Sequence, residues 1–144
     1  MSKPSNAAAF GALLALLVTA GVVSVGATES LDLGSSSQIP AAQGKISLKR
    51  TKNENVQIKL KVRHLAPAGK VTPGTMVYVV WARGLAAGSE AQNLGALKVD
   101  KNLNGKLTAV TAMRAFDVFL TCEQSQTTTV PAPPELLGVH YTGR

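Results

Sequence analysis

The sequence predicts an all-β domain made of short antiparallel strands. Three observations support this prediction: apolar and polar residues alternate from residue 44 onward, turn-forming residues separate the alternating runs, and no run has the helical period of about 3.6 residues. A chain of 144 residues is long enough for one domain with a compact core. We therefore expect one folded domain over residues 44–144.

The clearest strand is predicted over residues 55–65. Residues 45–50 alternate more weakly, with Ile46 and Leu48 inward, and the polar turn 51–55 joins the two strands. In the clearest strand, four aliphatic side chains face one side and four polar or charged ones face the other, as in a strand with one buried face: Val56, Ile58, Leu60 and Val62 against Gln57, Lys59, Lys61 and Arg63.

Five further strands are predicted. Residues 76–82 are apolar on both faces, which is typical of a central strand. Residues 93–99 form a strand with a bulge at Gly95, because glycine inside a strand often marks one. The pair Asn104-Gly105 indicates a hairpin into residues 107–111. The last two strands cover residues 115–122 and 135–141, and a Thr/Pro-rich crossing separates them.

Seven strands with turns at regular spacing predict a seven-stranded antiparallel sandwich of immunoglobulin-like architecture. A small Greek-key barrel is the alternative. The disulfide of antibody domains is absent, since Cys122 is the only cysteine. We expect Cys122 to be buried on the apolar face of its strand, with pairing to a second chain as the alternative. The residues expected in the core are Trp81, Phe116, Val56, Ile58, Leu60 and Val79.

The N-terminal segment predicts export. Lys3 precedes an uncharged apolar run over residues 7–25, and Val25-Gly26-Ala27 follows, which is the order of parts in a secretory signal peptide. Cleavage is expected between Ala27 and Thr28, with Ala20 as the second choice. An uncleaved inner-membrane anchor is the alternative, because about 20 apolar residues span a bilayer. Residues 28–43 predict a flexible linker. The product is expected in the periplasm, at the cell surface or outside the cell.

The sequence predicts no enzyme. Two histidines and one cysteine disfavour a metal cage or a nucleophile–base pair, so no catalytic, cofactor-binding or metal-binding residue is assigned. Residues 100–105 match the start of an EF-hand loop, but Thr111 stands where the bidentate Glu is needed, so a hairpin turn is expected. His64 and His140 are expected near strand ends, with no acid at a suitable sequence spacing.

The formal net charge is +7, and basic residues gather in the first two predicted strands. If these strands pair, the residues form a positive face suited to a protein or an anionic envelope polymer. Nucleic acid is disfavoured, because no aromatic residues are interleaved. Membrane contact is expected only if residues 7–27 are retained. The alternative is a solvated face that prevents edge aggregation. The candidate face consists of Lys45, Lys49, Lys59, Lys61 and Arg63.

Three segments carry a family resemblance: Tyr78 to Trp81 (Y-x-V-W), Leu94 to Leu97 (L-G-x-L) and Phe116 to Glu123 (F-x-x-F-x-T-x-E). The chain here resembles the extracytoplasmic C-terminal domains of bacterial anti-sigma-K-type regulators and related exported proteins. Such regulators carry a cytoplasmic sigma-binding region, whereas six residues precede the apolar segment here. The resemblance therefore implies an outer domain without that region.

The function expected from the sequence is a non-catalytic exported interaction or structural module. Two alternatives remain open. One is a membrane-anchored accessory of anti-sigma-type signalling. The other is a surface or filament subunit that associates with itself through its strand edges.

Overall fold

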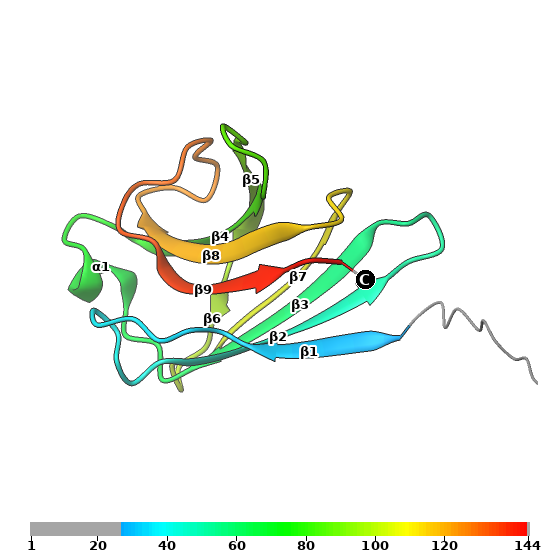
Figure 1. Ribbon diagram of the computed structural model, residues 1–144. Helices are drawn as coiled ribbons and strands as arrows, with labels where there is room; N and C mark the ends of the chain where they lie inside the picture. The colour runs from blue at the N-terminus through cyan, green and yellow to red at the C-terminus, as the bar shows by residue number, and fades with distance from the viewer. Residues whose placement is uncertain (1–26, 144) are drawn as a thin grey trace, which may run out of the picture.

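Nine strands, arranged in two antiparallel sheets, form the described part of this computed structural model, residues 27–143 (Figure 1). One short helix, α1 (Ala68–Val71), lies at one end. The five-stranded sheet contains, in spatial order, β1 (Thr28–Asp32), β2 (Gln43–Arg50), β3 (Val56–Arg63), β7 (Gly105–Thr111) and β6 (Lys98–Val99). The four-stranded sheet contains β5 (Ala91–Ala96), β4 (Val77–Gly84), β8 (Phe116–Glu123) and β9 (Leu136–Tyr141). The all-β prediction is confirmed.

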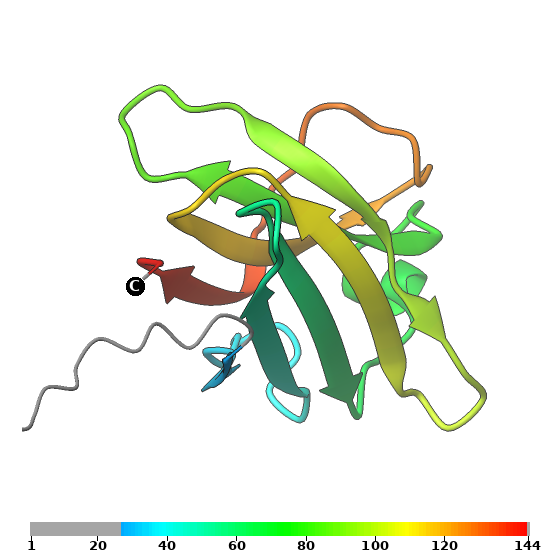
Figure 2. The same ribbon diagram turned by 90° about the vertical axis from the view of Figure 1, so that its right-hand side faces the viewer.

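The predicted number of seven strands is wrong, and one reason lies at Leu97. The run 93–99 is divided into β5, which pairs with β4, and β6, which pairs with β7. Leu97 stands between them with its side chain buried, and its N–H donates to the carbonyl of Tyr78 at 2.9 Å. The chain thus passes from one sheet to the other at this point (Figure 2).

The second reason lies in residues 28–43, for which the sequence predicts a flexible linker. Residues 28–32 instead form β1, which pairs with β2 from Thr28↔Lys49 to Asp32↔Lys45. Leu33, Ile39 and Ala42 of the following loop are buried. The N–H of Leu33 also donates to the carbonyl of Gly44 at 2.9 Å. The folded domain therefore begins before residue 44.

One core lies between the two sheets and receives side chains from both. On β3, the inward residues alternate with exposed Lys59, Lys61 and Arg63, as the sequence predicts. The predicted core positions Val56, Ile58, Leu60 and Phe116 belong to this shared core. Cys122 also lies in it, as expected.

Trp81 and Val79 are buried, but they lie outside the shared core. They form a second cluster with Phe119 on the outer face of the four-stranded sheet. Residues 124–134, here called the crossing segment, leave β8 and reach β5, since the side-chain amide of Asn93 donates to the carbonyls of Gln126 and Thr128. Because β4 lies between β5 and β8, the crossing segment passes over the strand that carries Trp81.

The predicted turns and bulge are present. Residues 51–55 connect β2 and β3, and the register between β4 and β5 shifts beside Gly95, which has a φ of 124°. The hairpin between β6 and β7 is also confirmed, but its left-handed residue is Leu103, at a φ of 63°, and not Asn104 or Gly105. Asp100 stabilises this turn, since its carboxylate accepts the N–H groups of Asn102 and Asn104.

The predicted signal peptide or anchor over residues 1–26 lies outside the described residues. Ala27 and Thr28, which flank the predicted cleavage site, are exposed, and Thr28 is the first residue of β1. Within residues 27–143, no helix has the length and apolar character needed to cross a membrane.

Candidate anion-binding face

The structure brings the five basic residues of the predicted binding face onto one surface. Strands β2 and β3 are antiparallel neighbours, and Ile46, Leu48 and the four aliphatic residues of β3 are buried on their inner face. Lys45 lies opposite Lys61, Ser47 opposite Lys59, and Lys49 opposite Gln57. Directly opposite residues share one face of a sheet. Lys45, Lys49, Lys59, Lys61 and Arg63 therefore project from the outer face of the five-stranded sheet, and all five are exposed.

Two further lysines extend this surface, and the sequence pattern does not indicate them. Lys106 on β7 lies opposite Lys61, and Lys98 on β6 lies opposite Lys106. Figure 2 shows β7 beside β3 and β6 at the edge of the same sheet. Pairing of β3 with β7 joins segments that are far apart in the chain, so no local pattern could have indicated it. We use the term basic face for Lys45, Lys49, Lys59, Lys61, Arg63, Lys98 and Lys106.

Four of these lysines form one row across neighbouring strands. In spatial order, the residues of the row are Asp32, Lys45, Lys61, Lys106 and Lys98. Directly opposite Cβ atoms lie about 4.5–5.5 Å apart, and like charges at that spacing are destabilising. The Lys45 ammonium lies 3.9 Å from the Asp32 carboxylate, and both side chains are mostly exposed, so this pair adds little stability. The row thus keeps an unbalanced positive charge.

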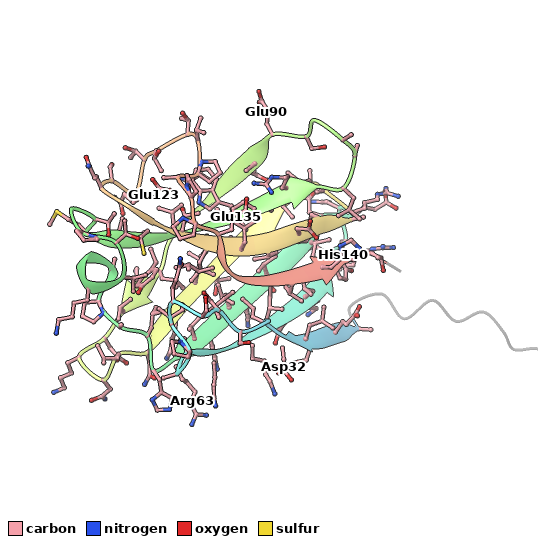
Figure 3. All side chains as sticks on the ribbon, turned by 60° about the vertical axis from the view of Figure 1, so that its left-hand side comes forward. Asp32, Arg63, Glu90, Glu123, Glu135 and His140 are labelled. Atoms are coloured by element: carbon pink, nitrogen blue, oxygen red, sulfur yellow. The ribbon has the colours of Figure 1, made fainter. Side chains whose placement is uncertain are left out.

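Four of the eight acidic residues lie on the four-stranded sheet or in its loops: Glu90, Asp117, Glu123 and Glu135. The other four, Glu29, Asp32, Glu54 and Asp100, lie on β1 or in the turns of the five-stranded sheet. Figure 3 places Glu90, Glu123 and Glu135 toward the four-stranded sheet, away from Arg63. Glu135 pairs with Arg83 at 2.7 Å, and Glu123 is buried and accepts the Thr121 hydroxyl and the Ala132 N–H. The carboxylates of Glu123 and Glu135 are therefore occupied by partners on their own side.

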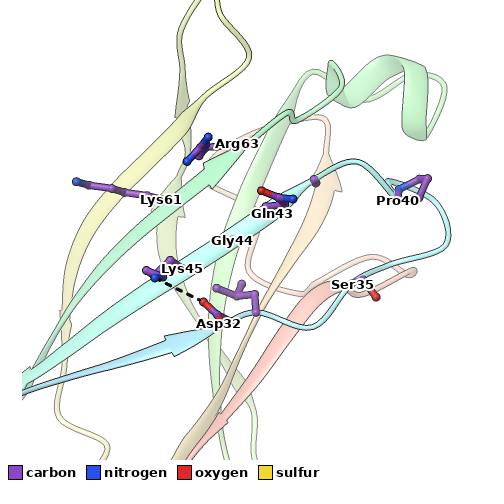
Figure 4. A pocket seen from close by; sticks show the side chains of 10 residues that line it. Asp32, Ser35, Pro40, Gln43, Gly44, Lys45, Lys61 and Arg63 are labelled. Carbon is purple, nitrogen blue, oxygen red and sulfur yellow. Dashed lines mark ion pairs between the residues drawn. The ribbon is translucent and has the colours of Figure 1, made fainter.

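Two depressions lie along the basic face. The larger, about 640 Å³, is at the end of the face and lies between the five-stranded sheet and the loop 33–42 (Figure 4). Its charged lining residues are Lys45, Lys61, Arg63 and Asp32, and its neutral polar ones include Ser35 and Gln43. The smaller, about 280 Å³, is lined by Thr28, Ser47, Lys49, Gln57 and Lys59. Both offer ammonium or guanidinium groups beside hydroxyl or amide groups, which is suitable chemistry for binding oxyanions.

One polar pair is not predictable from spacing along the sequence. His140 on β9 lies opposite Asp117 on β8, and the Nδ1 atom of the imidazole is 2.7 Å from Oδ1 of the carboxylate. A histidine beside an acid is therefore present, contrary to expectation, because strand pairing joins residues that are distant in sequence. Both side chains are about half exposed, and the pair lies on the four-stranded sheet, away from the basic face. His64 follows β3 and is exposed.

Cys122 is buried at the inner face of β8. Burial raises the pKa of its thiol, while hydrogen bonds with Thr72 and Thr75 act in the opposite direction. A thiol held protonated is a poor nucleophile. Burial likewise raises the pKa of the Tyr78 phenol, whose hydroxyl donates to the carbonyl of Ala66. The burial and the hydrogen bonds of the Cys122 thiol and the Tyr78 phenol therefore favour a structural role for both side chains.

Four residues that carry the family resemblance lie together. Trp81 and Phe119 are directly opposite on β4 and β8, and the indole N–H of Trp81 donates to the Thr121 hydroxyl at 2.8 Å. That hydroxyl donates to the Glu123 carboxylate, which also accepts the N–H of Ala132 in the crossing segment. This cluster holds the crossing segment on the sheet. No protein-family model matches the chain, and no curated protein does so.

Proposed function

We propose that this protein is a non-catalytic, exported binding module that attaches to a linear anionic polymer of the cell envelope through its basic face. The observation that carries the proposal is the row formed by Lys45, Lys61, Lys106 and Lys98. Neighbouring strands lie about 4.8 Å apart, so the row extends over about 14 Å. An extended polyanion lying across the strands would neutralise charges that otherwise repel one another.

Counterion release gives such an interface its affinity. Each phosphate or carboxylate that replaces a small ion at a lysine releases that ion to solution, so binding weakens as the salt concentration rises. The side chains of the face are mostly cations, and few of them could act as a nucleophile or as a general acid or base. This composition supports binding over catalysis. A polymer segment along the row would pass over the larger depression, whose lining includes Lys45 and Lys61.

The proposal includes an immunoglobulin-like architecture. Two antiparallel sheets with a shared core support this assignment. In this interpretation, β1 and β6 widen one sheet of the sandwich, and β6 adds Lys98 to the row of lysines on β2, β3 and β7. The resemblance to extracytoplasmic domains of anti-sigma-K-type regulators supports a position outside the cytoplasm.

The proposed export is tested by determining which residue begins the protein that growing cells produce, and in which cell fraction that protein is found. We expect mass spectrometry to find a chain that begins at Thr28 in the periplasmic, surface or medium fraction, because signal peptidases cleave after small residues such as Ala27. A chain that keeps Met1 in the cytoplasm would refute export. A chain that keeps residues 7–27 in the membrane fraction would favour the anchored signalling accessory instead.

Polymer binding is tested with purified protein and two soluble polyanions, polyphosphate and polygalacturonate. We expect binding at low salt that weakens about 60-fold between 50 and 200 mM salt, because about four contacts give a slope near −3 in log K against log salt. The triple variant Lys45→Gln, Lys61→Gln, Lys106→Gln is expected to lose most of the affinity. It is also expected to be at least as stable as the wild type, because like-charge pairs are removed. Calorimetry measures both quantities.

The matched control removes three cations from other surfaces. Lys52, Lys70 and Lys101 are exposed and lie in the turn 51–55, in α1 and in the β6–β7 hairpin. The control variant Lys52→Gln, Lys70→Gln, Lys101→Gln has the same net charge as the face variant and should keep the wild-type affinity within a few-fold. Equal losses in both variants would mean that net charge alone acts. Absence of polymer binding at low salt, or binding only to phosphatidylglycerol vesicles, would refute the proposal.

A further inference from the structure

The larger depression differs from the rest of the basic face in having a carboxylate beside its cations. Three cationic side chains, Lys45, Lys61 and Arg63, line it together with Asp32 (Figure 4). We infer that it is a recognition site for a phosphate monoester carried by a polyol or sugar unit, such as the end group of an anionic polymer. This inference rests on the proposed function, because it assigns the site that recognises one unit of the polymer.

The charges favour phosphate as the anionic group. Three cations against one carboxylate leave two positive charges, and a phosphate monoester carries about two negative charges at neutral pH. The cations come from neighbouring strands in fixed register, since Lys45 lies opposite Lys61 and Gln43 opposite Arg63. The Arg63 guanidinium offers a planar fork of donors that matches two phosphate oxygens, and the lysines add point charges.

Asp32 specifies the uncharged part of the ligand. A carboxylate repels a bare anion, but it accepts hydrogen bonds from hydroxyl groups. Its contact with Lys45 is long, at 3.9 Å, and its side chain is 82% exposed, so its oxygens are open to a ligand. Ser35 and Gln43 add a hydroxyl and an amide to the lining. A ligand with both a phosphate and hydroxyl groups therefore uses the whole lining, whereas inorganic phosphate uses only part of it.

The wall of the depression is held in place by the core. Leu33, Ile39 and Ala42 anchor the loop 33–42 beneath its exposed residues, and the N–H of Leu33 is bonded to the carbonyl of Gly44. A Cβ atom at Gly44 would lie 3.1–3.3 Å from side-chain atoms of Leu33, so this close approach favours glycine. Because the loop is already ordered, binding does not have to pay the entropy of ordering this wall. The volume of about 640 Å³ is in the usual range for small-molecule sites.

The test is a titration of ¹⁵N-labelled protein followed by NMR, with glycerol 1-phosphate, inorganic phosphate, glycerol and glucuronate as probes. We expect glycerol 1-phosphate to shift the amides of Gln43, Lys45, Lys61 and Arg63 saturably. It should bind about fivefold more tightly than inorganic phosphate, as about one additional hydrogen bond would give. Glycerol should cause no saturable shift, and glucuronate should bind more weakly than glycerol 1-phosphate.

Two variants test separately the carboxylate that would bind hydroxyl groups and the cations that would bind phosphate. Asp32→Ala is expected to strengthen inorganic phosphate binding and to abolish the preference for glycerol 1-phosphate, a pattern that a change in folding would not produce. Lys61→Gln should weaken glycerol 1-phosphate binding about tenfold, because one of three phosphate-facing cations is lost. Lys52→Gln is the control, since Lys52 is exposed in the turn 51–55 and lines neither depression, and it should change binding less than twofold.

The outcomes distinguish this inference from the proposed function. Shifts spread evenly over the basic face, or centred on Lys49 and Lys59, would overturn the inference while polymer binding stands. Tighter binding of glucuronate than of glycerol 1-phosphate would overturn the assignment to phosphate. Binding of neither the small anions nor the polymers would refute both proposals.

Discussion

Replacement of Trp81 by alanine is expected to destabilise the protein by about 3–5 kcal/mol, which is the usual cost of removing a large buried aromatic side chain. Trp81 is fully buried, and its cluster with Val79 and Phe119 lies beneath the crossing segment. The substitution leaves a cavity there and removes the donor to the Thr121 hydroxyl. A loss of this size is a large fraction of the roughly 5–15 kcal/mol that stabilises a typical domain.

The measurement for Trp81 is urea unfolding followed by far-UV circular dichroism. Fluorescence is unsuitable, since Trp81 is the only tryptophan of the chain. Trp81→Phe is the matched control: it keeps an aromatic ring but lacks the N–H donor, so we expect a loss of about 1–2 kcal/mol. A loss below about 1 kcal/mol for Trp81→Ala would show that the crossing segment does not pack over this side chain.

Leu60→Ala is expected to cost about 2–5 kcal/mol, the range for truncating a buried leucine. Leu60 is 1% exposed and lies on β3, between β2 and β7, in the core shared by the two sheets. At Leu60, β3 is paired on both sides, opposite Ile46 of β2 and Leu107 of β7, so the surrounding side chains cannot collapse fully into the cavity.

The neighbouring residue provides the control for Leu60. Lys61 is adjacent in sequence but points to the opposite face of β3, where it is exposed. Lys61→Ala should change the free energy of unfolding by no more than about 0.5 kcal/mol, as for ordinary surface positions. Similar losses at both positions in thermal or urea unfolding would mean that the alternation of faces along β3 is wrong.

Much of the fold is predictable from the sequence because side chains alternate every two residues along a strand. This period alone is enough to place Val56, Ile58 and Leu60 inward and the lysines of β3 outward. The apolar character of β4 on both faces correctly indicates a central strand, since β4 lies between β5 and β8. The five basic residues of β2 and β3 share a face for the same reason, because one short turn joins these two strands.

Other features depend on contacts that no local pattern encodes. Residues 28–32 lack alternating apolar residues, and they form a strand because the free edge of β2 offers hydrogen-bonding partners. The alternation of side chains assigns Trp81 to one face of β4. It does not indicate that the crossing segment covers that face and buries the indole. The same limit applies to Asp117 and His140, which meet only through the pairing of β8 with β9.

The sequence by itself thus determined the all-β class, the inward and outward residues of each clear strand, and the part of the basic face that β2 and β3 carry. The tertiary structure alone decided that Lys106 and Lys98 continue the row begun by Lys45 and Lys61, and that Asp32 and the loop 33–42 enclose a depression at its end. The physical reason is that alternation follows from the local geometry of one strand. The order of strands in a sheet, in contrast, is set by the burial of the whole core.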